Sequence, residues 1–155
     1  MARDPEGRSI VQPVTHQFLH RLGLETRGKG LTEITREIAA ALAAESAGDG
    51  LLTVFVRHTS ASLTIQENAD PDVRIDLLSA FERLAPEGAA YVHTIEGPDD
   101  MPAHIKTALT DTSLGVPVED GRMVLGTWQG IYLFEHRSRP HRREIVLQFL
   151  GSKRG

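Results

Sequence analysis

The segment 113–137 constrains the fold of this chain more than any other part of the sequence. It contains the only tryptophan, Trp128, between the dipeptides Gly126-Thr127 and Gln129-Gly130. Apolar residues alternate with other residues on both sides of the tryptophan, which predicts two strands, or one strand bent at its centre. Two glycines so close together inside a strand indicate a bulge, or a place where a ligand or another backbone comes near.

Beyond this bend, the alternation singles out Glu135. Period-two spacing places it on the same face as Ile131 and Leu133, whereas His136 falls on the opposite face. An unpaired carboxylate on an apolar face is costly, so Glu135 should meet a cation or several hydrogen-bond donors. We therefore regard Glu135 as a candidate catalytic acid or base. A structural ion pair, for example with Arg137, is the alternative.

The composition is typical of one soluble globular domain. The 155 residues are 40% hydrophobic and 25% charged, and the net charge of −4 argues against a dedicated nucleic-acid binder. The sequence has no cysteine, which excludes disulfides, zinc–thiolate sites and thiol nucleophiles. Because no long apolar run is present, we expect a cytoplasmic protein with neither a signal peptide nor a membrane partner.

The order of elements predicts an α+β fold. Helices are expected between groups of strands, with a mixed β-sheet or β-sandwich of about seven to nine strands. Besides the strands around Trp128, we expect strands near residues 14–22, 51–56, 61–66, 90–95 and 142–149. The expected helices are two longer ones, at about 32–47 and 71–84, and a short one at about 102–109; Thr32 and Asp70 are the caps of the longer two. A single domain over 13–151 would then follow a flexible arm, 1–12, and precede a tail, 152–155.

The sequence also resembles the YjbQ family, some members of which are described as secondary thiamine-phosphate synthases. The family signature is matched at Ser113, Val116, Val118, Gly121, Gly126-Thr127-Trp128-Gln129 and Ile131. The likeness continues in HTSASLTIQENADPDV, residues 58–73, and in HTIEGPDDMPAHIK, residues 93–106. These blocks lie in the C-terminal two thirds of the chain.

Three histidines beside strand ends or helix starts could form a divalent metal site. His58 follows a predicted buried strand, His93 precedes an acidic turn, and His104 lies in the first turns of the short helix. Three imidazoles with an open fourth position are typical of catalytic zinc. For each histidine alone, a bond to nearby backbone is the simpler explanation, but all three lie in blocks that match the family. Zn²⁺ is the favoured ion, and Mg²⁺ is the alternative for a pyrophosphate substrate.

Further site candidates surround these histidines in the sequence. Glu67 and Asp100 could orient the imidazoles or act as acid or base, although a helix cap explains Asp100 equally well. Trp128 and Gln129 are candidates for substrate binding, with a place in the core or an interface as the alternative for Trp128. A positive group that includes Lys106 and Arg137 suits a phosphorylated substrate.

The resemblance implies a function as well as a fold. It implies the coupling of a pyrimidine pyrophosphate to a thiazole phosphate with release of pyrophosphate, as a weak side activity, so that the main substrate is some other small phosphorylated metabolite. It further implies a compact homotrimer, in which a site at a subunit boundary would suit Trp128 and Gln129. Two alternatives stay open: a non-catalytic, metal-stabilised trimeric binding protein, and a metal-dependent hydrolase of a phosphate ester.

Overall fold

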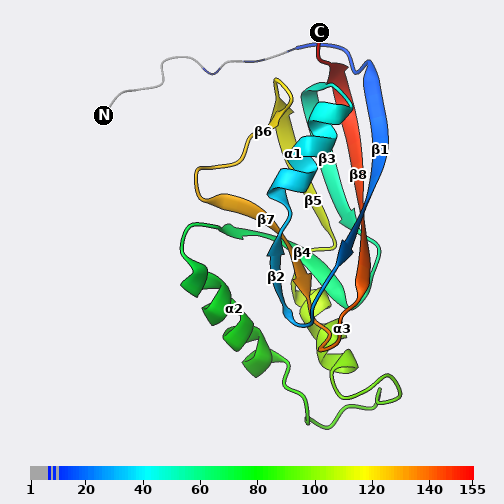
Figure 1. Cartoon of the computed structure of the whole chain (residues 1–155), viewed down its shortest axis with the longest axis vertical. Coiled ribbons are helices and arrows are strands. Elements are labelled where there is room, and N and C mark those ends of the chain that lie inside the picture. Colours follow the sequence, from blue (N-terminus) through cyan, green and yellow to red (C-terminus); the bar gives the residue numbers. More distant parts are fainter. Residues whose placement is uncertain (1–6, 8, 10) are drawn as a thin grey trace.

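The computed structural model describes residues 7, 9 and 11–155, which form an α+β sandwich (Figure 1). The strands are β1 (His16–Glu25), β2 (Gly30–Glu33), β3 (Ala47–Val56), β4 (Ala61–Glu67), β5 (Ser113–Glu119), β6 (Arg122–Met123), β7 (Gln129–Glu135) and β8 (Arg142–Lys153). The helices are α1 (Thr35–Ala44), α2 (Pro71–Leu84) and α3 (Asp100–Leu109). The predicted α+β class is therefore confirmed.

Two sheets make up the sandwich. The larger has the order β1-β8-β3-β5-β6 and the smaller the order β2-β7-β4. All the strand pairings of the described residues are antiparallel. Of the two arrangements expected, the β-sandwich is thus the one observed.

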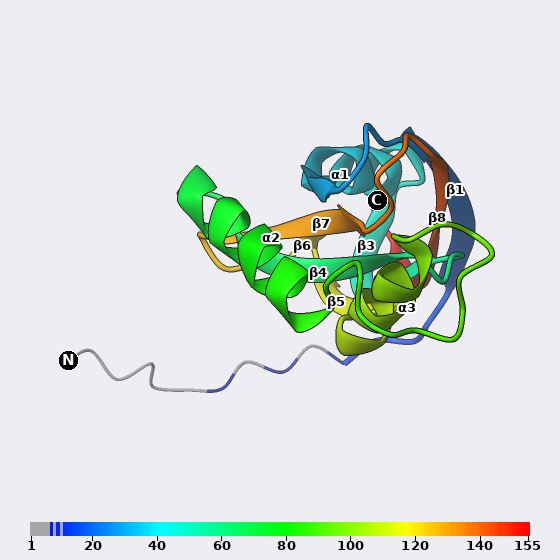
Figure 2. The same ribbon diagram turned by 90° about the horizontal axis from the view of Figure 1, so that it is seen from below.

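The main core lies between the two sheets. In β1, β3 and β8, side chains that point inward alternate with more exposed ones, as expected for strands with one buried face. Helix α1 adds Ile38 and Leu42 to this core and lies against β3, β6 and β7. Figure 2 shows α1 above β7 and β3 in the view from below.

Strand β7, the middle strand of the smaller sheet, is buried on both faces. Ile131 and Leu133 belong to the core between the sheets. On the opposite face Phe134 packs edge-on against Phe81 of α2, with ring centroids 5.1 Å apart. Glu135 is only 1% exposed, which confirms that the alternation places it on a buried face.

Helix α2 begins as predicted but is less buried than expected. Asp70 accepts a hydrogen bond from the backbone N–H of Asp72 at 2.9 Å, so the predicted cap is confirmed. However, none of its residues is fully buried, and Leu84 at its end is 63% exposed. The helix lies at the periphery of the molecule (Figure 2).

The first helix is shorter than predicted, and Thr32 is not its cap. Residues 30–33 pair with β7 as strand β2, so the chain is still extended at Thr32. Ile34 occupies the cap position without a side-chain hydrogen bond. The helix ends at Ala44, before the predicted end at about residue 47, where β3 already begins. Pairing with a long-range partner overrode the local helix signals here.

The predicted strand at 90–95 is wrong. Between α2 and α3 the chain forms an irregular loop, which is visible at the bottom of Figure 1. The alternation of Tyr91, His93 and Ile95 suggested a strand, yet Ile95 is almost fully exposed and no sheet edge meets this segment.

At its C-terminal end the domain is longer than predicted. Strand β8 runs to Lys153, two residues beyond the expected end of the domain at 151. Residues 1–6, 8 and 10 of the expected arm lie outside the described residues. Among the helices of the described part, none is long and apolar enough to cross a membrane.

Candidate functional site

A polar cluster forms where the irregular loop 85–99, α3 and the segment after β7 meet. The Nε2 atom of His93 lies 2.7 Å from the carboxylate oxygen Oδ2 of Asp100, and the Nε2 atom of His104 lies 3.1 Å from the same oxygen. Asp100 and His104 are one helical turn apart on α3, so both side chains project from one face. His93 reaches them from the loop. We call His93, Asp100 and His104 the histidine–aspartate cluster.

An arginine fixes the carboxylate of this cluster. Arg137 donates from Nη1 to the other oxygen of Asp100, Oδ1, at 2.7 Å, and from Nε to Asp99 at 3.0 Å. Burial alone would raise the pKa of Asp100, but the hydrogen bond from His93 and the charge of Arg137 outweigh it, so the pKa is lowered. Asp100 is therefore held ionised and in a fixed orientation.

His104 shows a conflict that the described residues leave unresolved. Its Nδ1 atom lies 2.9 Å from the carbonyl oxygen of Thr59, which can only accept, so Nδ1 carries a proton. In a neutral imidazole the Nε2 atom then presents a lone pair, and this atom faces the carboxylate oxygen of Asp100. Two acceptors at this distance require a positive charge between them, which either a second proton or a metal ion would provide.

The donor set of the cluster suits a divalent ion. One ligand atom from each of the three residues lies within 4.8 Å of the others. Tetrahedral zinc separates its ligand atoms by about 3.4 Å, since its bonds to nitrogen and oxygen are about 2.0–2.1 Å long. The bond from His104 to a backbone carbonyl and the bond from Arg137 to Asp100 are the outer contacts that usually orient metal ligands. The residues therefore fit a divalent ion.

His58, the third predicted metal ligand, lies outside the cluster. Its Nε2 atom accepts a hydrogen bond from the backbone N–H of Glu144 at 2.9 Å. Burial and the nearby Arg143 lower the pKa of His58, which keeps this imidazole neutral and its lone pair occupied. The structure thus brings together two of the three predicted histidines, and Asp100 takes the place of the third. Asp100 is the first residue of α3, and the predicted cap position belongs to Asp99.

Glu135 forms a separate and closed site. Arg143 binds both of its carboxylate oxygens, at 2.5 and 2.6 Å, and Thr26 and the backbone N–H of Arg137 donate further hydrogen bonds. Burial by itself would raise the pKa of Glu135, but the paired guanidinium and these donors lower it. Its partner is therefore Arg143 rather than Arg137, and all of the contacts described are internal to the fold.

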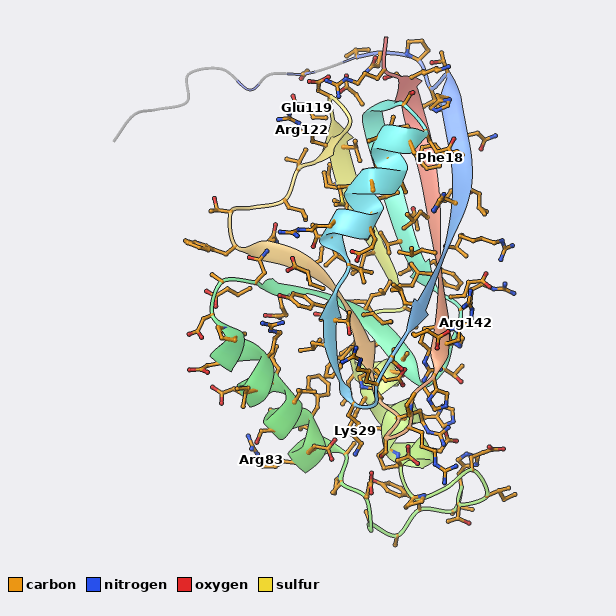
Figure 3. The ribbon with its side chains drawn as sticks, viewed as in Figure 1. Phe18, Lys29, Arg83, Glu119, Arg122 and Arg142 are labelled. Carbon is orange, nitrogen blue, oxygen red and sulfur yellow. The ribbon has the colours of Figure 1, made fainter. Side chains whose placement is uncertain are left out.

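Lys106 and Arg137, predicted to bind substrate, already have carboxylate partners. Lys106 is buried, and its Nζ atom donates to Glu82 of α2 at 2.5 Å. Lys29 donates to the same carboxylate at 3.2 Å from the turn between β1 and β2, close to the lower end of α2 in Figure 3. Neither Lys106 nor Arg137 presents an unpaired positive charge to a substrate.

Glu67, Trp128 and Gln129 lie at the other end of the smaller sheet. Glu67 pairs with Gln129, six residues along the strands from the pair Ala61–Glu135, a separation of about 20 Å. The side chain of Gln129 accepts from the backbone N–H of Gly126 at 2.8 Å and so closes the bend that was predicted. Trp128 is 61% exposed. Within one chain these three residues do not join the histidine–aspartate cluster.

Two residues of functional interest were missed in the sequence. Asp99 accepts from Arg137 and from the backbone N–H of Ser138, and these bonds outweigh burial and lower its pKa to about 2. The acidic pair Asp99-Asp100 at the start of the short helix was the sequence feature that could have identified Asp99. The buried His136 bonds to Ser62 at 2.8 Å, and burial lowers its pKa to about 3, so it is a neutral packing residue. Its position opposite Glu135 in the alternation was the available hint.

The same family emerges from comparisons with known proteins. Residues 20–152 match a family model described as UPF0047 protein YjbQ-like. The chain is 54% identical over 131 residues to a UPF0047 protein of Synechocystis, covering 84% of this chain and 89% of that protein. It is 46% identical over 135 residues to the UPF0047 protein YjbQ of Salmonella typhimurium, covering 86% and 98%.

A solved structure supports the same relationship. The uncharacterized conserved protein of the YjbQ/UPF0047 family from Clostridium acetobutylicum superposes with a TM-score of 0.78 at 36% identity. The match covers 84% of this chain and 98% of that one. The chain therefore belongs to the UPF0047 family of YjbQ-like proteins.

Proposed function

We propose that the histidine–aspartate cluster binds a divalent metal ion, preferably zinc, and is the catalytic centre of an enzyme acting on a small phosphorylated metabolite. The observation that carries this proposal is the geometry of His104: its Nδ1 atom donates to a backbone carbonyl while its Nε2 atom lies 3.1 Å from the carboxylate of Asp100, so that a neutral ring would direct a lone pair at an acceptor. A divalent ion removes this conflict and uses all three side chains as ligands.

The number of ligands favours catalysis over a purely structural role. Structural zinc is usually enclosed by four protein ligands, whereas catalytic zinc has three and keeps one position open. The cluster offers three, and the side chains of His93 and His104 are about a third or more exposed. A small molecule can therefore reach this site from solvent.

The residues of the chain have distinct tasks in this proposal. When bound, the ion would supply Lewis-acid polarisation of a phosphate or leaving-group oxygen. Thr59 fixes the tautomer of His104 through its carbonyl, and Arg137 holds Asp100 in the orientation a ligand needs. Asp99 in turn keeps Arg137 in place.

The family resemblance suggests the first candidate reaction, a weak coupling of the thiamine-phosphate-synthase type. Hydrolysis of a phosphate ester is the second candidate, and one observation favours it. A pyrophosphate leaving group calls for several free cations, whereas Lys106, Arg137 and Arg143 are each bound to carboxylates. A substrate with a single phosphate places a smaller demand on the site.

Metal analysis of the purified chain tests the proposal. We expect elemental analysis and zinc titration to give one divalent ion per chain, and His104→Ala to lose it without unfolding. His58→Ala is the matched control, since His58 lies outside the cluster, and it should keep the ion. The absence of metal even after reconstitution would refute the proposal and identify His104 as an imidazolium in an ion network. With a metal-replete protein, a screen against phosphorylated metabolites then separates an enzyme from a non-catalytic binding protein.

We also propose that the protein is a homotrimer, as the resemblance implies. Exposed apolar side chains near the start of β7 and in the first turns of α2 support an interface there, among them Trp128 and Ile75. An interface at this end would bring Trp128 and Gln129 of one subunit against another subunit. Sedimentation should give three times the 17.0 kDa chain mass, and Trp128→Glu should shift it towards the monomer. A wild-type monomer at micromolar concentration would contradict this.

A further inference from the structure

A cleft opens beside the histidine–aspartate cluster, within the loop between α2 and α3. It has a volume of about 330 Å³ and is lined by residues between Gly88 and Pro98, including Tyr91 and Thr94. His93 lines it too, while its Nε2 atom bonds to Asp100 of the cluster. The same side chain thus belongs to both the cleft and the proposed metal site.

Apart from His93, no acidic or basic side chain lines the cleft. Ala89, Pro98 and the ring of Tyr91 supply apolar surface, and Thr94 supplies one hydroxyl. The hydroxyl of Tyr91 donates to the carbonyl of Pro86 at 2.8 Å, which fixes the ring as a wall. Small-molecule sites are typically clefts of this kind, mostly apolar with a few polar groups.

Two glycines determine the shape of the loop that forms the cleft. Gly88 and Gly97 have φ angles of 83° and 103°, which other residues rarely adopt. A Cβ atom on Gly97 would also lie 3.2 Å from the carboxylate of Asp99. The loop therefore turns back on itself at both ends, and this turn carries His93 to Asp100.

The charges of the cluster and of the cleft suggest where the anionic and the uncharged parts of a substrate would bind. Near the cluster, Asp99, Asp100 and Arg137 sum to one negative charge, and Lys106 and Arg143 are each paired with a glutamate. An anionic group would thus need the positive charge of a divalent ion and would lie at the cluster. Besides His93, which belongs to the cluster, the adjoining cleft offers an anion no basic side chain, but it can remove apolar surface from water.

We propose that this cleft is the subsite for the uncharged, ring-sized organic part of the substrate, and that Tyr91 is its main specificity-determining residue. This inference rests on the proposed function, because it assumes that the anionic part binds at the metal-loaded cluster. The substrate class it identifies is a phosphate monoester, or a similar compact anion, carrying a small planar or aliphatic ring.

Calorimetric titration of the zinc-loaded full chain with two probes tests this inference. Methylphosphonate and phenylphosphonate share the anionic group, but only the second carries a ring. We expect phenylphosphonate to bind about tenfold more tightly, as burial of part of one ring face predicts. Tyr91→Ala should abolish this preference without weakening the binding of methylphosphonate.

Three further variants distinguish a specific cleft from a general effect on the loop. Tyr91→Phe keeps the ring but loses the bond to Pro86, so it should retain the preference. Val92→Ala changes a fully exposed neighbour that does not line the cleft and is the matched control. Ala89→Leu narrows the cleft from an exposed position and should reduce the preference even if Tyr91→Ala were to disturb the loop.

The outcomes separate this inference from the proposed function. Equal affinity of the two probes for the wild type, or no binding of either to the zinc-loaded chain, overturns the cleft subsite but leaves the metal site standing. A chain that binds no zinc refutes the proposed function and, with it, the inference that rests on it. A ring preference that persists in both Tyr91→Ala and Ala89→Leu would place the ring elsewhere and also overturns the assignment.

Discussion

Two buried carboxylates near the end of β7 are each held by an arginine, yet they differ in what surrounds them. Glu135 is paired with Arg143 through both oxygens, and Thr26 and a backbone N–H complete its hydrogen bonds. Asp100 receives one arginine contact, on one oxygen, and directs the other oxygen at two histidines. The first site is closed, whereas the second borders solvent through His93 and His104.

The two carboxylates differ in how completely the fold supplies their hydrogen-bond and charge partners, and not in how deeply they are buried. A buried charge whose partners are all supplied by the fold has nothing left to offer a ligand, and its role is to hold the structure together. A carboxylate that faces the lone pair of an imidazole is incomplete without a further positive charge. Burial drew attention to Glu135 in the sequence, but the incomplete set of bonds points to Asp100.

The largest effect is expected for Glu135→Gln. An amide keeps the shape but strands the buried charge of Arg143, which should lower the free energy of unfolding by about 3–5 kcal/mol. Urea denaturation measures this, and zinc binding by the folded variant should change little. Glu67→Gln is the matched control, since the Glu67 carboxylate makes no hydrogen bond to the described residues, and it should change the stability by less than about 0.5 kcal/mol.

The opposite result would reverse the comparison. If Glu135→Gln melts like the wild type but no longer binds metal or turns over substrate, then Glu135 is functional, as its place in the sequence pattern first suggested.

The second prediction concerns Arg137, which connects the two networks. Arg137→Lys removes the fork that reaches Asp99 and Asp100 together, because an ammonium group cannot make both contacts in one plane. Zinc affinity should fall by about 10–100-fold, the usual effect of losing an outer contact of a ligand. Competition with a chromogenic chelator gives this value. Unchanged affinity would mean that Arg137 does not orient the ligand.

Much of the fold follows from local patterns in the sequence. The alternation around Trp128 predicted strands and the buried position of Glu135, and Asp70-Pro71 predicted the start of α2. Local signals were wrong where long-range pairing decided the outcome. Thr32 looked like a helix cap but lies in β2 and pairs with Leu133 of β7, and the alternation of 90–95 had no sheet edge to join.

The site was only partly predictable for a related reason. His93, His104 and Asp100 were all candidates, but sequence spacing does not reveal that a loop folds His93 back onto α3. Nor does it show that a backbone N–H occupies the lone pair of His58, or that Arg143 rather than Arg137 meets Glu135. Which donors are already in use is a property of the three-dimensional structure.

The third prediction concerns how the free energy of unfolding depends on pH, because both the Asp99–Arg137 pair and the Glu135–Arg143 pair contain an ionised carboxylate. Asp99 has its pKa lowered from 3.8 to about 2, and the pKa of Glu135 is lowered as well. A carboxylate with a depressed pKa stabilises the fold above its unfolded-state value, and this contribution is lost as the pH falls through the folded-state value. The free energy of unfolding should therefore decrease between about pH 4 and pH 2, and Asp99→Asn should decrease less steeply. Parallel curves for the variant and wild type would show that Asp99 contributes nothing in this range.

Only a small change in stability is expected for Asp100→Asn, the substitution that matches Glu135→Gln. An amide at this position can still accept from Arg137 through its oxygen, and its NH₂ group can donate to the Nε2 atoms of both His104 and His93 once His93 takes the tautomer with its proton on Nδ1. Loss of the charge-assisted bond and relief of the conflict oppose each other, so the free energy of unfolding should change by no more than about 1 kcal/mol. Zinc affinity should nevertheless collapse, because the site loses an anionic ligand. Denaturation and chelator competition on the same sample measure both quantities. A loss of stability as large as that of Glu135→Gln would mean that the two carboxylates have the same structural role, and that the acceptor conflict at His104 is met by a proton in the folded protein.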